Sequence, residues 1–157
     1  MAVKNRSIEI CRGSDLELRE SAIEPEWIIG GDPRARSSWW SSSSDGIDSN
    51  HVWDCTAGRF RWYFGSDETV HIIEGEVEVS GEGISPTWLR AGDAALFRAG
   101  TWATWHVPRY VRKHAILRSE LPMPLRVQVD YGRRAKRLLR RAFGKPVADE
   151  MQPLHQL

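Results

Sequence analysis

The residues that could bind a metal or do acid–base chemistry are spread along the chain. The five histidines are His51, His71, His106, His114 and His155. Because His71 lies three residues after Glu68, the two side chains should face opposite sides of an extended strand. Two cysteines, Cys11 and Cys55, are too few for a disulfide scaffold, and we expect Cys55 to be a small buried hydrophobe. No Ser–His–Asp arrangement, phosphate-binding loop or CxxC motif supports nucleophilic or nucleotide chemistry.

Short extended segments must position these residues. From residue 51 to 129, segments rich in Val, Ile, Thr and aromatic residues alternate with turn signals, and several have a period of two. In FRWYF, for example, Phe60, Trp62 and Phe64 share one face. Turns are expected at residues 74–76, 80–83, 91–93 and 99–101. The pattern predicts an all-β, antiparallel sandwich or barrel.

The two ends of the chain differ from this middle part. Residues 37–46, SSWWSSSSDG, are expected to be a surface loop in which Trp39 and Trp40 pin the loop to the barrel or form a lid. Residues 132–144 predict a basic amphipathic helix that ends at Gly144. We therefore expect an N-terminal arm with the Ser-rich loop over 1–49, a barrel over 50–131, and a C-terminal helix and tail over 132–157.

Composition excludes several classes of protein. The chain has 157 residues, of which 41% are hydrophobic, and this suits one folded domain. Without an 18-residue apolar run or a secretory signal, we expect a cytosolic protein without a membrane span. Residues 132–157 carry seven Lys/Arg and two Asp/Glu, which leaves 15 basic and 19 acidic residues before them. The main body is therefore not a nucleic-acid binder by charge.

Two stretches resemble the motifs of the cupin superfamily. ETVHIIEG, residues 68–75, is similar to the end of the first motif, and residues 92–103, GDAALFRAGTWA, are similar to the second. Residues 50–118 look most like the branch that includes (S)-ureidoglycine aminohydrolase and ethanolamine-utilisation cupins. The resemblance implies a jelly-roll β-barrel, followed here by the C-terminal helix.

The resemblance also implies where a metal would bind. Metal-binding cupins use two His and a Glu from the first motif and a His from the second, a set that suits Mn, Fe, Ni or Zn. The matching positions here are Trp62, Phe64, Glu68 and Ala103, with Arg61 and Tyr63 replacing the first two under a longer spacer. Only Glu68 is retained, so we expect no metal cofactor; a set of recruited histidines is the alternative.

An acid among aromatic rings remains at this position. Trp105 lies two residues after Ala103 and should share its inward face. The rings either fill the barrel or line a cavity for a flat or apolar ligand. Glu68 is a structural ion-pair partner of Lys113 or Arg98, an anchor for an amine or ureido group, or a general acid/base. The predicted ligand-binding residues are Trp62, Phe64, Glu68, Arg98, Ala103, Trp105 and Lys113.

Three functions follow from these features. The first is a small-molecule-binding cupin without the usual metal-ligand histidines. The second is an enzyme similar to (S)-ureidoglycine aminohydrolase that acts on a small nitrogenous metabolite, with Glu68 in the metal or base role. The third is a non-catalytic interaction protein with a filled barrel. We expect a homodimer in each case, because cupins often pair through their sheets.

Overall fold

The computed structural model describes residues 7–13 and 15–120, and this part of the chain is built from β-strands. The strands are β1 (Arg19–Glu20), β2 (Ile28–Gly31), β3 (Ala35–Ser42), β4 (Asp48–Phe64), β5 (Asp67–Gly81), β6 (Ile84–Arg90), β7 (Ala94–Phe97) and β8 (Thr101–Arg118). A 3-10 turn, η1 (Pro25–Trp27), precedes β2. The prediction of an all-β fold is confirmed for these residues. The helix expected over 132–144 lies outside them.

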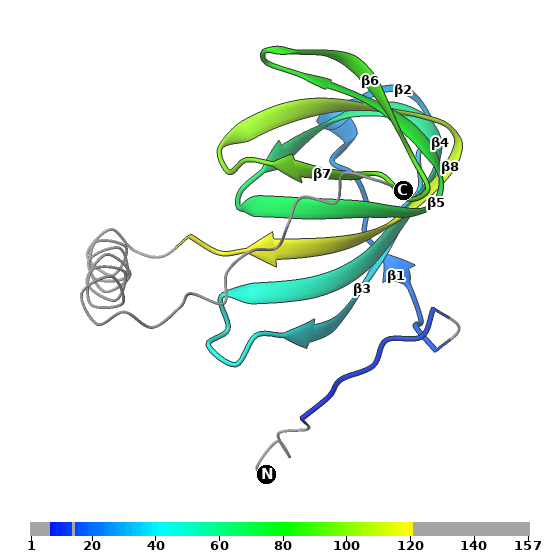
Figure 1. Cartoon of the computed structure of the whole chain (residues 1–157). Helices are drawn as coiled ribbons and strands as arrows, with labels where there is room; N and C mark the ends of the chain where they lie inside the picture. The colour runs from blue at the N-terminus through cyan, green and yellow to red at the C-terminus, as the bar shows by residue number, and fades with distance from the viewer. Residues whose placement is uncertain (1–6, 14, 121–157) are drawn as a thin grey trace, which may run out of the picture. The chain divides into compact units, whose positions relative to one another are not determined.

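All strands pair antiparallel in the order β1-β3-β4-β8-β5-β6, with β2 added to β4 and β7 added to β5. Each long strand has two sets of neighbours. The first part of β4 pairs with β3 and its last part with β2, while β5 pairs first with β7 and then with β6. Figure 1 shows β4, β5 and β8 curving from the part of the sheet that holds β1 and β3 to the part that holds β2 and β6. This curvature encloses one interior face.

A bulge replaces one of the expected turns, and a second bulge lies near Gly58. The sequence predicted a turn at 74–76, but β5 continues through it, as β4 does through Gly58, and the pairing of both strands with β8 shifts register at these places. Gly75 has φ +73°, and a Cβ at this position would overlap the carbonyl oxygen of Tyr110. A Cβ on Gly58 would lie 2.6 Å from the ring of Pro33. The glycines therefore let the Tyr110 carbonyl and the Pro33 ring lie close to the backbone of continuous strands, and they do not mark chain reversals.

The prediction that residues 37–46 form a loop is wrong for most of that segment. Residues 37–42 belong to β3, which pairs with β4 from Ala35 opposite Cys55 to Ser42 opposite Ser49. The edge of β4 supplies hydrogen-bond partners for the backbone of β3. The serine side chains therefore do not divert that backbone into local hydrogen bonds. Trp39 is 59% exposed, and Trp40 donates a hydrogen bond to His114 on β8. Trp40 therefore pins β3 to β8 from a strand, not from a loop.

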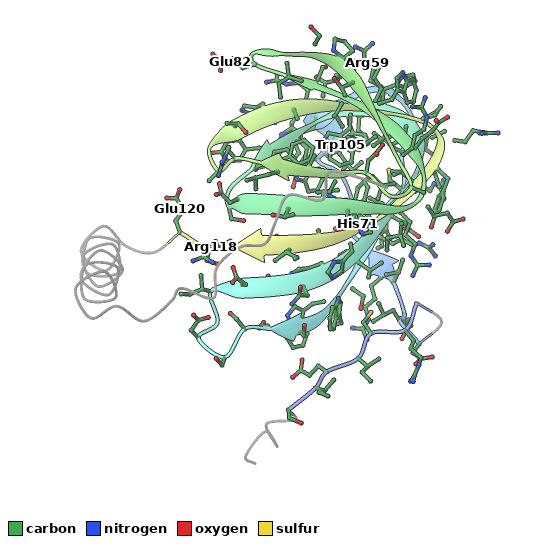
Figure 2. All side chains as sticks on the ribbon, in the orientation of Figure 1. Arg59, His71, Glu82, Trp105, Arg118 and Glu120 are labelled. Carbon is green, nitrogen blue, oxygen red and sulfur yellow. The ribbon has the colours of Figure 1, made fainter. Side chains whose placement is uncertain are left out.

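The interior is apolar and rich in aromatic residues. Along β5, Val70 and Ile72 are buried and the intervening His71 is exposed, so the strand alternates as the sequence predicted. Phe60 and Phe64 on β4 and Trp105 on β8 are almost fully buried in the same cluster. Figure 2 shows the side chain of Trp105 within the curved sheet, while Glu82 lies on the hairpin between β5 and β6 at its edge. No described helix has the length and hydropathy that crossing a membrane requires.

Candidate functional site

Glu68, the acid retained from the cupin motif, is held in a buried ion pair. It shares the inner face of β5 with Val70 and Ile72, opposite to His71, as predicted. Nζ of Lys113 on β8 donates to Oε1 of Glu68 at 2.6 Å, and the two residues are 5% and 7% exposed. This contact matches the ion-pair role that the sequence left open. The other candidate partner, Arg98, instead contacts Asp67 at 3.3 Å on the surface.

Two indole rings enclose the ammonium group of Lys113. Its Nζ lies 4.8 Å from the ring centroid of Trp53 and 4.6 Å from that of Trp105. The faces of both rings attract a cation, so they stabilise the charge that burial would otherwise penalise. The sequence indicated Lys113 and Trp105 but not Trp53. Trp53 contributes because the pairing of β4 with β8 places it directly opposite Lys113. The buried Nε1 groups of Trp53 and Trp105 have no hydrogen-bond partner among the described residues.

His51 is the titratable neighbour of this ion pair, and no role was predicted for it from the sequence. Burial lowers the pKa of His51, the charge of Glu68 raises it, and the charge of Lys113 lowers it. Its Nε2 lies 3.0 Å from the hydroxyl of Ser49. His51 follows the same alternation as Trp53 and Cys55, which places it on the inner face of β4. Period-two alternation in HVWDC could have indicated this position.

The predicted aromatic residues lie together, and most of them fill the interior. Phe64 stacks on Phe97 with 4.4 Å between the ring centroids, and Phe97 lies 5.4 Å from Trp105. Trp62 is half-buried and meets Trp53 edge to face at 6.2 Å. Phe64 and Trp105 are 2% and 1% exposed, so these two rings are core residues. Phe97, which the sequence did not single out, lies opposite Glu68 in the pairing of β7 with β5.

A small pocket opens beside these rings, and we call it the rim pocket. Its volume is about 170 Å³. It is lined by Val79, Ser80, Gly81, Glu82, Ile84, Leu96, Phe97, Arg98, Thr101, Trp102 and Ala103. Ala103 takes the position of the second-motif histidine and is paired with Trp62 on one side and Gly81 on the other. Of the predicted site residues, Ala103 and Arg98 line this pocket, and Phe97 connects it to the aromatic interior.

The residues at the metal-ligand positions do not fit a metal ion. Trp62, Phe64 and Ala103 offer no nitrogen, oxygen or sulfur lone pair suited to a metal, and Glu68 is engaged with Lys113. In the described part of the chain, no three or more His, Cys, Asp or Glu side chains lie together as a metal site requires. The side chains at these positions therefore support no metal-dependent step.

The remaining described histidines lie away from the interior. His106 faces outward, with Nδ1 3.7 Å from a carboxylate oxygen of Glu78. His114 accepts a hydrogen bond from the indole of Trp40 at 3.3 Å. Burial and the charges of His71 and His51 lower the pKa of His114. His155 lies outside the described residues.

A second buried acid, Asp54, has a structural role. Arg36 donates two hydrogen bonds to its carboxylate, at 3.0 and 2.5 Å, and the hydroxyl of Tyr110 donates another at 3.0 Å. Burial, the hydrogen bond and the charge of Asp54 raise the pKa of Tyr110 to about 12. These contacts connect β3, β4 and β8, and no sequence motif marks them.

Comparisons with known proteins agree with the motifs and the fold. Residues 42–115 match the EutQ-like cupin domain. Ethanolamine utilization protein Q from Salmonella typhimurium LT2 has the same fold, with a TM-score of 0.58 and 19% identity over 71% of this chain and 85% of that one. KdgF from Halomonas sp. has a TM-score of 0.53 and 13% identity over 73% of this chain and 96% of that one.

A third solved structure has a higher identity. A DUF861 family protein from Pseudomonas syringae pv. tomato DC3000 has 26% identity and a TM-score of 0.59 over 66% of this chain. This chain spans 45% of the length of that protein. No curated protein matches the sequence. From the domain match, the shared fold and the two motif stretches, residues 42–115 form a cupin domain of the EutQ-like branch.

Proposed function

We propose that this cupin binds a small, flat, largely apolar molecule in the rim pocket. The observation that carries the proposal is the pocket itself, which lies beside Ala103, where metal-binding cupins have a histidine. A small side chain at this position leaves space that an imidazole would fill. Phe97, Leu96 and Val79 give the pocket apolar walls, and aromatic walls favour flat ligands.

The volume restricts the class of ligand. An apolar cavity of about 150 Å³ is known to accept one benzene ring, and the rim pocket has about 170 Å³. One six-membered ring with a small substituent is therefore the largest occupant that fits without movement of the walls. The exposed guanidinium of Arg98, held by Asp67, would contact a polar substituent at the rim.

The other predicted site residues support the pocket from behind. Phe97 stacks on Phe64 and contacts Trp105, and Trp105 covers the ammonium of Lys113 in its pair with Glu68. In this proposal the residues behind Phe97 hold its ring in position as a wall of the pocket, whereas Ala103 and Arg98 contact the ligand. Trp62 fixes the other flank of Ala103 through strand pairing.

Titration with phenol, monitored by calorimetry, tests the proposal. Ala103→Leu should fill the pocket and abolish binding, while Thr69→Leu, on the exposed face of β5, serves as the matched control. Because Ala103→Leu adds volume near the core, Ile84→Ser is the second variant; Ile84 is 61% exposed, so its loss should weaken binding without unfolding the protein. Binding that both variants leave unchanged would contradict this location.

The two alternative functions have separate tests. For an aminohydrolase, ammonia release from ureidoglycine should be measured with and without Mn; no release in either case removes this alternative. Elemental analysis tests metal independence, because a stoichiometric transition metal would contradict it. For an interaction protein, light scattering gives the oligomeric state, and failure of the rim pocket to bind any single-ring compound would favour that role.

A further inference from the structure

A second and larger pocket lies on the opposite, outer face of the sheet. None of the residues that match the cupin motif positions for a metal lies in its lining. Its volume is about 530 Å³, within the range of small-molecule sites. Trp40 on β3, Val52 on β4, Ile73 and Glu74 on β5, and Arg112 on β8 contribute to its wall. We call it the outer-face pocket.

The floor of the outer-face pocket is apolar and fixed. Val52 is only 3% exposed although it does not belong to the interior core cluster, so residues on the outer face cover it. The ring of Trp40 lies 5.7 Å from that of His114, and the hydrogen bond between them holds both rings in place. Ile73 is 47% exposed at the edge. This floor suits an aliphatic or aromatic group.

The charged groups of the pocket are opposite in sign and are not paired with each other. Glu74 and Arg112 are direct cross-strand partners in β5 and β8, yet no ion pair joins them in the described part of the chain. Arg112 donates from Nη2 to the carbonyl of Gly13 at 3.4 Å. Its buried Nε has no hydrogen-bond partner among residues 7–13 and 15–120. Because Nε is covered by neighbouring atoms, a ligand oxygen would contact the part of the Arg112 side chain that lines the pocket.

We propose that the outer-face pocket binds a small zwitterion of the amino-acid type with an apolar side chain. The ligand carboxylate pairs with the guanidinium of Arg112, since Arg matches the geometry of carboxylates. The ligand ammonium pairs with Glu74, and its side chain lies on Trp40 and Val52. This site is independent of the rim pocket and goes beyond the function proposed above.

L-phenylalanine is the probe, with 3-phenylpropanoate and phenethylamine as analogues that lack the ammonium and the carboxylate. Calorimetry should show each analogue binding roughly 10- to 100-fold more weakly than L-phenylalanine, the expected loss for a charge-assisted hydrogen bond. Glu74→Gln should weaken the binding of L-phenylalanine by a similar factor and leave the binding of 3-phenylpropanoate unchanged. Arg112→Gln should also weaken the binding of L-phenylalanine, but it should leave the binding of phenethylamine unchanged.

Glu74 is exposed, so its variant should fold. Glu76→Gln, on the same strand beside Arg90, is the matched control and should leave binding of L-phenylalanine unchanged. The proposal is overturned if L-phenylalanine does not bind at millimolar concentrations or if Glu74→Gln and Glu76→Gln bind it equally. It is also overturned if light scattering shows a dimer that Ile73→Lys dissociates, because a second copy would then cover this face.

Discussion

The ion pair between Lys113 and Glu68 allows a quantitative prediction. Lys113→Met keeps a straight apolar stem against Trp53 and Trp105 but removes the ammonium that contacts Glu68 at 2.6 Å. Glu68 is 7% exposed and would be left buried without its partner. Removal of one partner from a buried pair costs about 3–5 kcal/mol. At about 2–4 °C per kcal/mol for a chain of this size, Tm should fall by roughly 6–20 °C.

A double-mutant cycle measured by urea unfolding separates this pair from general damage to the core. Glu68→Gln should cost about as much as Lys113→Met, and the double variant should lose less than the sum, with a coupling of about 2–3 kcal/mol. Arg98→Gln, which breaks the exposed pair with Asp67, is the control and should cost less than about 1 kcal/mol. If Glu68→Gln lowers the free energy of unfolding no more than Arg98→Gln does, the ion-pair reasoning is refuted.

Individual residues support three further predictions. Gly75→Ala should cost roughly 3 kcal/mol or more in urea unfolding, because its Cβ would overlap the carbonyl oxygen of Tyr110 at φ +73°; a cost below about 1 kcal/mol would contradict the bulge geometry. Burial lowers the pKa of His51 and His114, so their contribution to stability is present above their ordinary pKa of 6.5 and is lost as the pH falls below it. Urea midpoints should therefore fall in acid, and an unchanged pH profile in a His51→Gln/His114→Gln variant would refute this cause. Burial raises the pKa of Cys55 to about 12, so iodoacetamide at neutral pH should label Cys11 in the native protein and leave Cys55 unmodified; equal labelling would count against its burial.

The inner face could be predicted because alternation and motif spacing act locally. Glu68 and His71 face opposite sides, and Ala103 and Trp105 share the inner face, as period two requires. The continuous strands could not be predicted, because glycine produces the same signal in a turn and in a bulge. Gly75 is needed for the approach of the Tyr110 carbonyl, a contact between residues far apart in sequence.

The partners of the site residues depend on strand register, which sequence alone did not provide. Both Lys113 and Arg98 were reasonable partners for Glu68, but Glu68 points inward with Lys113 while the neighbouring Asp67 contacts Arg98 at the surface. The outer-face pocket forms only because β3 pairs with β4. The serines of residues 37–42 led to the prediction of a loop in place of that strand. Serine is common in loops because of its local hydrogen bonds, yet an available strand edge outweighs this preference here.

Mapping of phenol binding by two-dimensional NMR tests the central claim most directly. Phenol should shift the backbone amide signals of Leu96, Phe97 and Ala103, which line the rim pocket, and should leave those of His71 and Glu74 on the outer face unchanged. Saturable shifts confined to the rim pocket are the predicted result. The absence of saturable shifts at Phe97 and Ala103, or shifts confined to the outer face, would contradict a ligand site at the cupin position.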